Sequence, residues 1–320
     1  METMYFFEKN DFKKTASKCS LALILYVAAE YALIYVLTFV GALFKNSNGI
    51  GGLFTSLFEV MAEKNTELII SIAASLISFF VVFTLVFGRE FKEALKGRLG
   101  FDERGLVVAG KGVCALMLSA LVGTSVFIVF NFILKLFGHN YDADAVLNIH
   151  YEGAYHIVFI AYGCIIAPII EELVCRGFVL GSLKKYSNEA AIVISAVMFA
   201  AMHGIYAQFP LAFLAGLVLG CATVYSGSVT VTILMHMIYN SSVMFIEESV
   251  SGGNMYIEGG LSLLMLAAYI YGAVVIIKAV KNAVWIDGKL TTGLYGMFFG
   301  RIPVLLFLAA HIVLGAYFIN

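Results

Sequence analysis

Long apolar runs recur through most of this 320-residue chain, and they limit the folds that it can adopt. A helix needs about 20 mainly apolar residues to cross the ~30 Å hydrocarbon core of a bilayer. Composition agrees, since 61% of the residues are hydrophobic and 13% are charged, against about 45–50% and about 25% in soluble domains. We therefore predict an all-α polytopic transmembrane helical bundle of about nine spans, or eight, forming a single integral membrane domain over residues 1–320. The nine candidate spans are residues 19–44, 67–87, 110–137, 153–174, 190–206, 209–226, 228–247, 260–284 and 303–319.

The stretch between the first two candidate spans is shorter than a membrane crossing. Over residues 50–65, the apolar side chains Leu53, Leu57, Phe58 and Met61 recur at helical spacing. Such a one-sided apolar pattern is typical of a helix that lies in the membrane interface. We therefore predict an interfacial helix over this range.

Lysine and arginine residues cluster in alternate loops of the nine-span arrangement. Such loops lie in the cytoplasm by the positive-inside rule. We therefore predict a multi-pass protein of the cytoplasmic membrane, with a cytoplasmic N-terminus and a C-terminus outside. No basic run predicts binding to nucleic acid, and the five cysteines form no C-x-x-C motif. The basic segments carry Lys9, Lys13, Lys14 and Lys18; Arg89, Lys92, Lys96, Arg98 and Arg104; Lys184 and Lys185; and Lys278, Lys281, Lys289 and Arg301.

The fourth candidate span contains the sequence APIIEELVCRG, from Ala167 to Gly177. Ionisable residues within a span are costly and mark a functional site by default. Glu172 and Arg176 are four residues apart, so they lie on one side of a helix and can neutralise each other. Glu171 points about 100° away from Glu172. We therefore expect Glu171 to lack that partner and to be able to act as a general base.

Two further polar groups follow on the next spans. FAAMH runs from Phe199 to His203, and HMIYN runs from His236 to Asn240. Two imidazoles with a carboxylate are a ligand set for a catalytic zinc ion, here His203, His236 and Glu171. The same residues also suit a metal-free general base with an oxyanion stabiliser. The residues alone leave both chemistries open.

Helix geometry predicts that two of these groups approach each other. Glu171 and His203 lie 16 residues before and after the basic turn near residue 187. Equal distances from the turn of an antiparallel helix pair put both residues at one level, roughly 24 Å from the turn. For Glu30, alone in the first span, we expect a helix-packing or interfacial role.

The three groups together resemble the motifs of the CPBP family of intramembrane proteases, also called the CAAX-protease and bacteriocin-processing (Abi) family. EELVCR, FAAMH and HMIYN match its pattern of Glu-Glu-x-x-x-Arg, Phe-x-x-x-His and His-x-x-x-Asn in order and spacing. The resemblance covers residues 155–250, which would form the protease core. One departure is Cys175, where the family usually has an aromatic or large apolar residue, and we expect this position to pack rather than react.

The resemblance implies an intramembrane endopeptidase similar to CAAX prenyl proteases. By motif, Glu171 would activate water with help from His203, and His236 and Asn240 would bind the developing oxyanion. Glu172 and Arg176 would support the site. A divalent metal such as zinc is one expectation, and a metal-free glutamate mechanism is the other.

Two alternatives from other classes stay open at this point. The first is a non-catalytic membrane protein that binds a peptide, such as a bacteriocin self-immunity factor. The second is a transporter with an ion-coupled carboxylate pair, although the two halves show no repeat symmetry. The expected partners are a membrane-associated peptide or protein and the lipid bilayer. The sequence determines neither the substrate nor the oligomeric state.

Overall fold

The fold is helical throughout the part of the chain that the structure describes. The structure is a computed structural model, and it describes residues 2–45, 49–141, 151–251, 253, 255–282, 293–316 and 319. Within these ranges the regular secondary structure is helical, apart from an isolated β-bridge between Tyr141 and Ile319. The all-α prediction is therefore confirmed for the described residues.

Most of the helices follow one another with short connections. Three segments, named η, have the wider π-helical winding and continue the α-helices beside them. The elements are α1 Glu2–Lys45, α2 Gly49–Ala62, α3 Lys64–Phe80, η1 Val81–Val86, α4 Gly88–Leu95, α5 Glu103–Leu136, α7 Gly153–Ala161, η2 Tyr162–Ile166, α8 Ala167–Glu172, η3 Leu173–Leu180, α9 Gly181–Leu183, α10 Asn188–Met202, α11 Phe209–Ser226, α12 Val229–Ser251, α13 Met255–Lys281, α14 Leu294–Phe299 and α15 Ile302–Ala316.

Seven helical segments in the described ranges are long and apolar enough to cross a membrane, so the chain is a multi-pass integral membrane protein. By this measure the prediction of nine spans was too high. The two remaining candidates are the 15-residue helices α10 and α15, each only ~22 Å long. The seven are Lys9–Lys45, Lys64–Val86, Glu103–Leu136, Gly153–Leu183, Phe209–Ser226, Val229–Val250 and Met255–Lys281.

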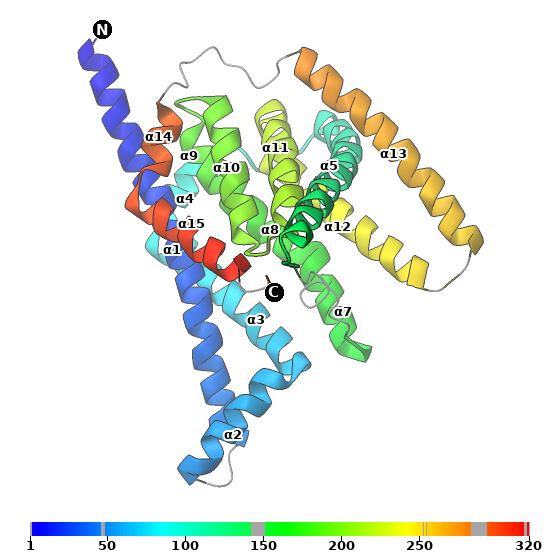
Figure 1. The fold of residues 1–320 in the computed structure, drawn as a ribbon. Helices are drawn as coiled ribbons and strands as arrows, with labels where there is room; N and C mark the ends of the chain where they lie inside the picture. The colour runs from blue at the N-terminus through cyan, green and yellow to red at the C-terminus, as the bar shows by residue number, and fades with distance from the viewer. Residues whose placement is uncertain are drawn as a thin grey trace.

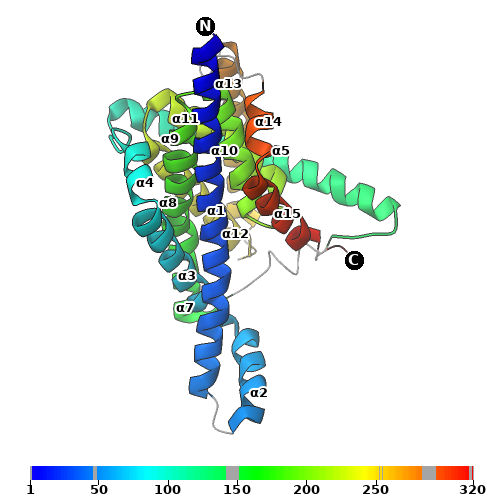
Figure 2. The ribbon, with the colours of Figure 1, turned by 90° about the vertical axis from the view of Figure 1, so that its left-hand side faces the viewer.

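Each of the two short helices has its own reason for being short. α10 lies between α11 and η3 and is mostly buried, so its length need not match the thickness of the lipid core. It ends at Met202, because Gly204 adopts the left-handed conformation with φ of 64°. α15 ends about halfway along α1 in both ribbon views (Figures 1 and 2). The predicted ninth span therefore does not run the full height of the molecule.

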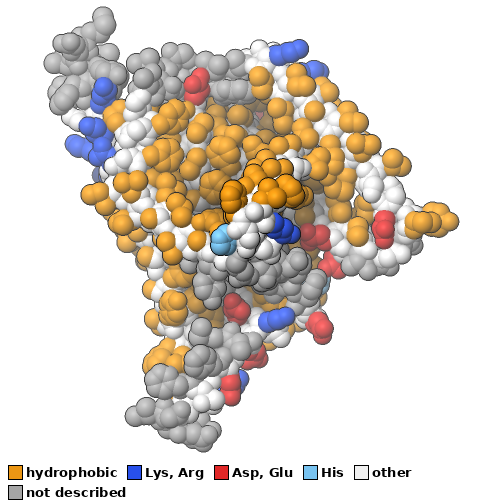
Figure 3. Space-filling view, in the orientation of Figure 1, with side chains coloured by type: hydrophobic (Ala, Val, Ile, Leu, Met, Phe, Trp, Pro, Cys, Tyr) orange, Lys and Arg blue, Asp and Glu red, His pale blue; other side chains and the backbone are white. Residues whose placement is uncertain are grey.

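The helices are arranged around α10 and α11 (Figure 1). α1 lies on one flank with α14 and α15 against it, and α5, α12 and α13 lie on the other. The predicted helix over residues 50–65 is present as α2, and it packs against both α1 and α3. Its placement in a membrane interface remains a prediction. Hydrophobic side chains cover a broad area of the molecule's face, as expected for contact with lipid (Figure 3).

Glycine permits the closest approaches between the central helices. A Cβ atom on Gly216 of α11 would lie 2.9 Å from the Cα atom of Ala196 in α10. A Cβ atom on Gly272 of α13 would collide with the backbone carbonyl of Cys114 in α5. Small residues let helices pack backbone to backbone in membranes. These contacts set the separation of α10 from α11 and of α13 from α5.

Three of the predicted basic segments meet at one end of the molecule. Lys18 of α1 forms an ion pair with Glu90 of α4 at 2.7 Å. Lys185, in the turn before α10, pairs with Asp11 of α1 at 2.9 Å. Arg98, after α4, donates to the carbonyl oxygen of Gly181 at 3.0 Å. These contacts agree with the predicted placement of all three segments on one side of the membrane.

Candidate functional site

The fourth span carries the paired glutamates between two π-helical segments. Its helical segments run without a break from Gly153 to Leu183. Glu171 and Glu172 end the short α8, with η2 before it and η3 after it. Single π-helical turns within α-helices occur often at functional sites. Pro168 lies in the same short segment and cannot donate a backbone hydrogen bond there.

Glu172 and Arg176 form a pair that is completely buried, as their spacing predicts. Arg176 Nη1 donates to Glu172 Oε1 at 2.7 Å, and both side chains have 0% exposure. Arg176 Nη2 donates to the carbonyl oxygen of Gly216 in α11 at 3.2 Å. The guanidinium carbon lies 4.3 Å from the centre of the Phe199 ring in α10. We call Glu172 and Arg176 the buried pair, and it connects the fourth span to α10 and α11.

His236 of α12 lies between the two glutamates. Its Nδ1 atom is 3.2 Å from Glu172 Oε1, and its Nε2 atom is 3.7 Å from Glu171 Oε2. The Glu172 carboxylate accepts from Arg176 and has no proton to give, so Nδ1 of His236 is the donor in the shorter contact. The longer distance exceeds that of a hydrogen bond. His236 is therefore held by Glu172 and presents Nε2 to Glu171.

His203 is joined to this group through Phe199. Nδ1 of His203 donates to the carbonyl oxygen of Phe199 at 2.9 Å, which leaves Nε2 as the second ring nitrogen for other contacts. The Phe199 ring lies edge-on to both imidazoles, with centroid distances of 4.9 Å to His203 and 5.8 Å to His236. Among the described residues, no hydrogen bond joins His203 to Glu171. The predicted approach of these two residues is therefore indirect.

Asn240 lies one turn after His236 and faces the fourth span. Its Nδ2 atom donates to the carbonyl oxygen of Gly163 in η2 at 2.8 Å. An amide nitrogen carries two hydrogens, so a second donor remains. Glu171, His203 and Asn240 are all partly exposed, with Glu171 at 27%. We call these three residues the open edge, and their catalytic roles remain predictions.

Sequence reasoning missed a polar group that the N-terminal helices place beside Glu171. The hydroxyl groups of Tyr26 in α1 and Ser75 in α3 are 3.0 Å apart. Ser75 also interacts with Glu30 of α1 and Tyr162 of η2, and both lie within electrostatic range of Glu171. Glu30 was visible as an ionisable residue within a span. Ser75 and Tyr162 gave no signal, because isolated hydroxyl groups are common in membrane helices.

The residues expected to bind a metal do not form a complete ligand set. A catalytic zinc site uses three protein ligands. Among the described residues, no group of three or more His, Cys, Asp and Glu side chains could hold a metal ion. Of the predicted set, Glu171 and His236 approach each other, whereas no hydrogen bond or ion pair among the described residues joins His203 to either of them. The arrangement does not fit a bound metal, and metal use remains a prediction.

Cys175 behaves as its sequence context predicts. The side chain is completely buried, and its sulfur lies 3.8 Å from the sulfur of Met202 in α10. A buried thiol among apolar groups is inert. The departure from the family pattern at this position therefore concerns packing.

Comparison with known proteins identifies one segment of the chain. Residues 153–242 match the family model described as type II CAAX prenyl endopeptidase Rce1-like. The match covers the fourth span, α10, α11 and the part of α12 that carries His236 and Asn240. Neither the curated proteins nor the solved structures include a significant match. Residues 153–242 therefore form a domain of the Rce1-like type II CAAX prenyl endopeptidase (CPBP/Abi) family, whose members are intramembrane peptidases.

Proposed function

We propose that this protein is an intramembrane endopeptidase that hydrolyses a peptide bond in a membrane-associated protein or peptide, with Glu171 activating the water. The observation that carries the proposal is the contrast between the adjacent glutamates. Glu172 is completely buried and paired with Arg176, whereas Glu171 is 27% exposed and faces Nε2 of His236. A general base must be able to reach both water and substrate.

The distance between Glu171 and His236 suits a water molecule that contacts both. A water oxygen at about 2.8 Å from each of two atoms can be accommodated when those atoms are 3.7 Å apart. In the proposed reaction, Glu171 takes a proton from this water as its oxygen attacks the carbonyl carbon. Glu171 then gives the proton to the departing amine nitrogen, which completes hydrolysis. Nε2 of His203 would help to hold the water.

The oxyanion that forms during this attack would be bound by His236 and Asn240. Because Nδ1 of His236 donates to Glu172, the ring can donate to an oxyanion only from a proton on Nε2. The second amide hydrogen of Asn240 would supply another donor. The buried pair would position His236 without touching the substrate.

The proposal is tested by cleavage of reporter peptides by the purified protein in liposomes. One peptide carries a prenylated C-terminal CAAX sequence, and the other has the same sequence without the prenyl group. Mass spectrometry identifies the bond that is cut. We expect Glu171→Ala and His203→Ala to lose cleavage, while Glu103→Ala, which removes an exposed carboxylate at the start of α5, retains it.

Full cleavage by either site variant would contradict the proposal. The non-catalytic alternative, a peptide-binding or immunity protein, predicts that the wild-type protein binds the reporter and leaves it intact. No feature of the described residues favours that alternative over hydrolysis.

A further inference from the structure

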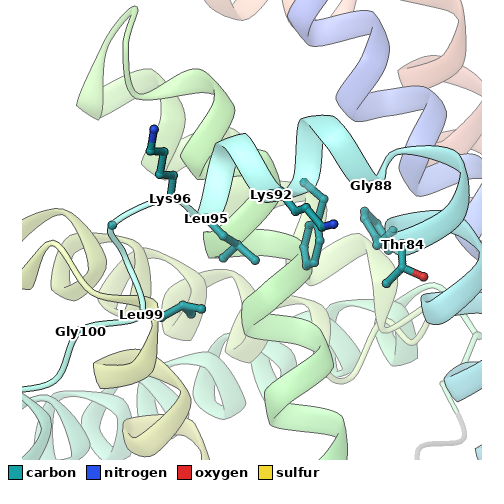
Figure 4. A pocket seen from close by; sticks show the side chains of 10 residues that line it. Thr84, Gly88, Lys92, Leu95, Lys96, Leu99 and Gly100 are labelled. Carbon is teal, nitrogen blue, oxygen red and sulfur yellow. The ribbon is translucent and has the colours of Figure 1, made fainter.

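A cavity unrelated to the motif residues lies where the second span ends. Its volume is about 620 Å³, and it is lined by residues of η1, α4 and the loop that follows α4 (Figure 4). The span Lys64–Val86 ends within the cavity's lining, which includes Phe83 and Thr84. The cavity therefore lies at the level where hydrocarbon gives way to lipid headgroups. Its volume is within the range of small-molecule binding sites.

The interior of this cavity is apolar. Phe83, Phe91, Leu95 and Leu99 contribute to its lining. Leu95 extends from α4 and Leu99 from the following loop, and both side chains line this space (Figure 4). Leu99 is 56% exposed. An apolar surface of this kind at a membrane boundary can take up a hydrocarbon chain.

Two lysines add positive charge to the same cavity. Lys92 and Lys96 line it, and both side chains are exposed. Among the described residues, neither lysine forms an ion pair. The nearby carboxylates have other partners, since Glu90 pairs with Lys18 at 2.7 Å and Glu93 with Arg89 at 3.2 Å. Lys18 also lowers the pKa of Glu90, which keeps that carboxylate charged and bound to Lys18.

We propose that this cavity binds an anionic phospholipid, with an acyl chain against Leu95 and Leu99 and its anionic headgroup at the positively charged rim to which Lys92 and Lys96 contribute. Charge complementarity favours an anionic occupant, because a lipid with a net negative charge is attracted by the two lysines more strongly than a lipid whose headgroup has no net charge. Basic pockets beside transmembrane helices bind anionic headgroups in this way. The predicted topology puts these lysines on the cytoplasmic side, whose membrane surface is negatively charged.

The bound lipid would lie against residues that pack on η3, the segment of the fourth span that follows Glu172. Leu95 contacts Gly177 of η3 so closely that an added Cβ atom there would be 2.7 Å from Leu95 Cδ2. The rings of Phe83 and Phe178 are in edge contact, with centroids 5.4 Å apart. The proposal concerns binding alone, so it stands whether or not the protein is a protease.

Binding to the detergent-solubilised full chain tests the proposal. The probe is a fluorescent phosphatidylglycerol, compared with a phosphatidylcholine that has the same acyl chains and fluorophore. We expect phosphatidylglycerol to bind about tenfold more tightly, since each lysine near an anionic headgroup contributes to binding. The double variant Lys92→Gln/Lys96→Gln should lose this preference. The matched control Lys278→Gln/Lys281→Gln, which removes two exposed lysines from the end of α13, should keep it.

A variant of the apolar lining locates the site independently. Leu99→Asp should weaken the binding of both lipids, and its exposed position makes folding insensitive to the change. Equal affinity for the two lipids would overturn the proposal. The proposal would also be overturned if Lys278→Gln/Lys281→Gln lost the preference for phosphatidylglycerol to the same extent as Lys92→Gln/Lys96→Gln. Unchanged lipid binding by Leu99→Asp would overturn it as well. Stronger displacement by a prenyl alcohol would assign the cavity to a prenyl chain, and displacement by glycerol phosphate would assign it to a soluble phosphate.

Discussion

The buried pair and the open edge contain neighbouring residues in very different surroundings. Glu172 and Arg176 have no exposed side-chain surface, and they contact α10, α11 and α12. Glu171, the preceding residue, is 27% exposed, and its carboxylate lies 3.7 Å from Nε2 of His236. A helix turns by about 100° per residue, so adjacent residues meet different neighbours. Of two adjacent glutamates, one can therefore contribute to stability while the other is available for reaction.

The largest expected effect in this comparison is on catalysis at the open edge. Glu171→Ala should lower the cleavage rate about a thousandfold or more, because a general base contributes 10²–10⁴-fold. The free energy of unfolding should change by less than about 0.5 kcal/mol, since the carboxylate makes no hydrogen bond within the described residues. Reporter cleavage and denaturant unfolding in micelles measure the two effects. A large loss of stability with intact cleavage would show that Glu171 contributes to folding and is not the general base.

The corresponding change in the buried pair should act on stability. Arg176→Ala leaves the Glu172 carboxylate buried without its cation and should lower the free energy of unfolding by about 3 kcal/mol. The chain offers a matched control, since Arg89 and Glu93 are also four residues apart but are 87% and 67% exposed. Arg89→Ala should cost at most about 0.5 kcal/mol.

A double variant separates charge burial from packing in the same unfolding measurement. Glu172→Gln/Arg176→Met removes both charges and should be more stable than Arg176→Ala, because no isolated charge remains buried. If Arg176→Ala and Arg89→Ala had equal costs, burial would not explain the role of the buried pair.

Sequence reasoning predicted the parts of this site that depend on spacing alone. Four-residue spacing predicted the contact between Glu172 and Arg176, and it is present at 2.7 Å. Hydropathy placed the three motifs on three different apolar segments, and these segments are helices, with His203 directly after the last residue of α10. The family match over residues 153–242 confirms the resemblance drawn from those motifs. Local periodicity is sufficient for such predictions because i,i+4 neighbours share a helix face.

Features that depend on packing could not be predicted in this way. The fifth candidate span runs to residue 206 and includes the apolar Ile205 and Tyr206, but the helix ends at Met202. Hydropathy does not distinguish an apolar loop from an apolar helix. The π-helical segments beside α8 and the approach of Glu30 and Ser75 to Glu171 arise from contacts between distant helices. One chain's residue pattern contains no direct signal for those contacts.

Asn240 tests whether the open edge includes an oxyanion donor. Asn240→Ala should lower kcat about a hundredfold with little change in KM, because an oxyanion contact forms only in the transition state. Loss of the hydrogen bond to the Gly163 carbonyl should also cost about 1 kcal/mol of stability. Ser241→Ala, at the exposed neighbouring position, is the control and should leave kcat unchanged. If kcat fell no further than the loss of folded protein explains, Asn240 would have a structural role only.

Metal removal should have the smallest effect on the cleavage rate. The result distinguishes activation of the water by Glu171 from activation by a bound metal ion. Glu171 and His236 approach each other to 3.7 Å, but among the described residues no third His, Cys, Asp or Glu side chain joins them in a group that could hold a metal ion. We therefore expect dialysis against a strong chelator, with residual metal measured by mass spectrometry, to leave cleavage within about twofold of the untreated enzyme, because a general base needs no metal. A loss that zinc restores would instead make Glu171 and His236 ligands. The open edge would then bind a metal, and the water would be activated by that ion rather than by the carboxylate.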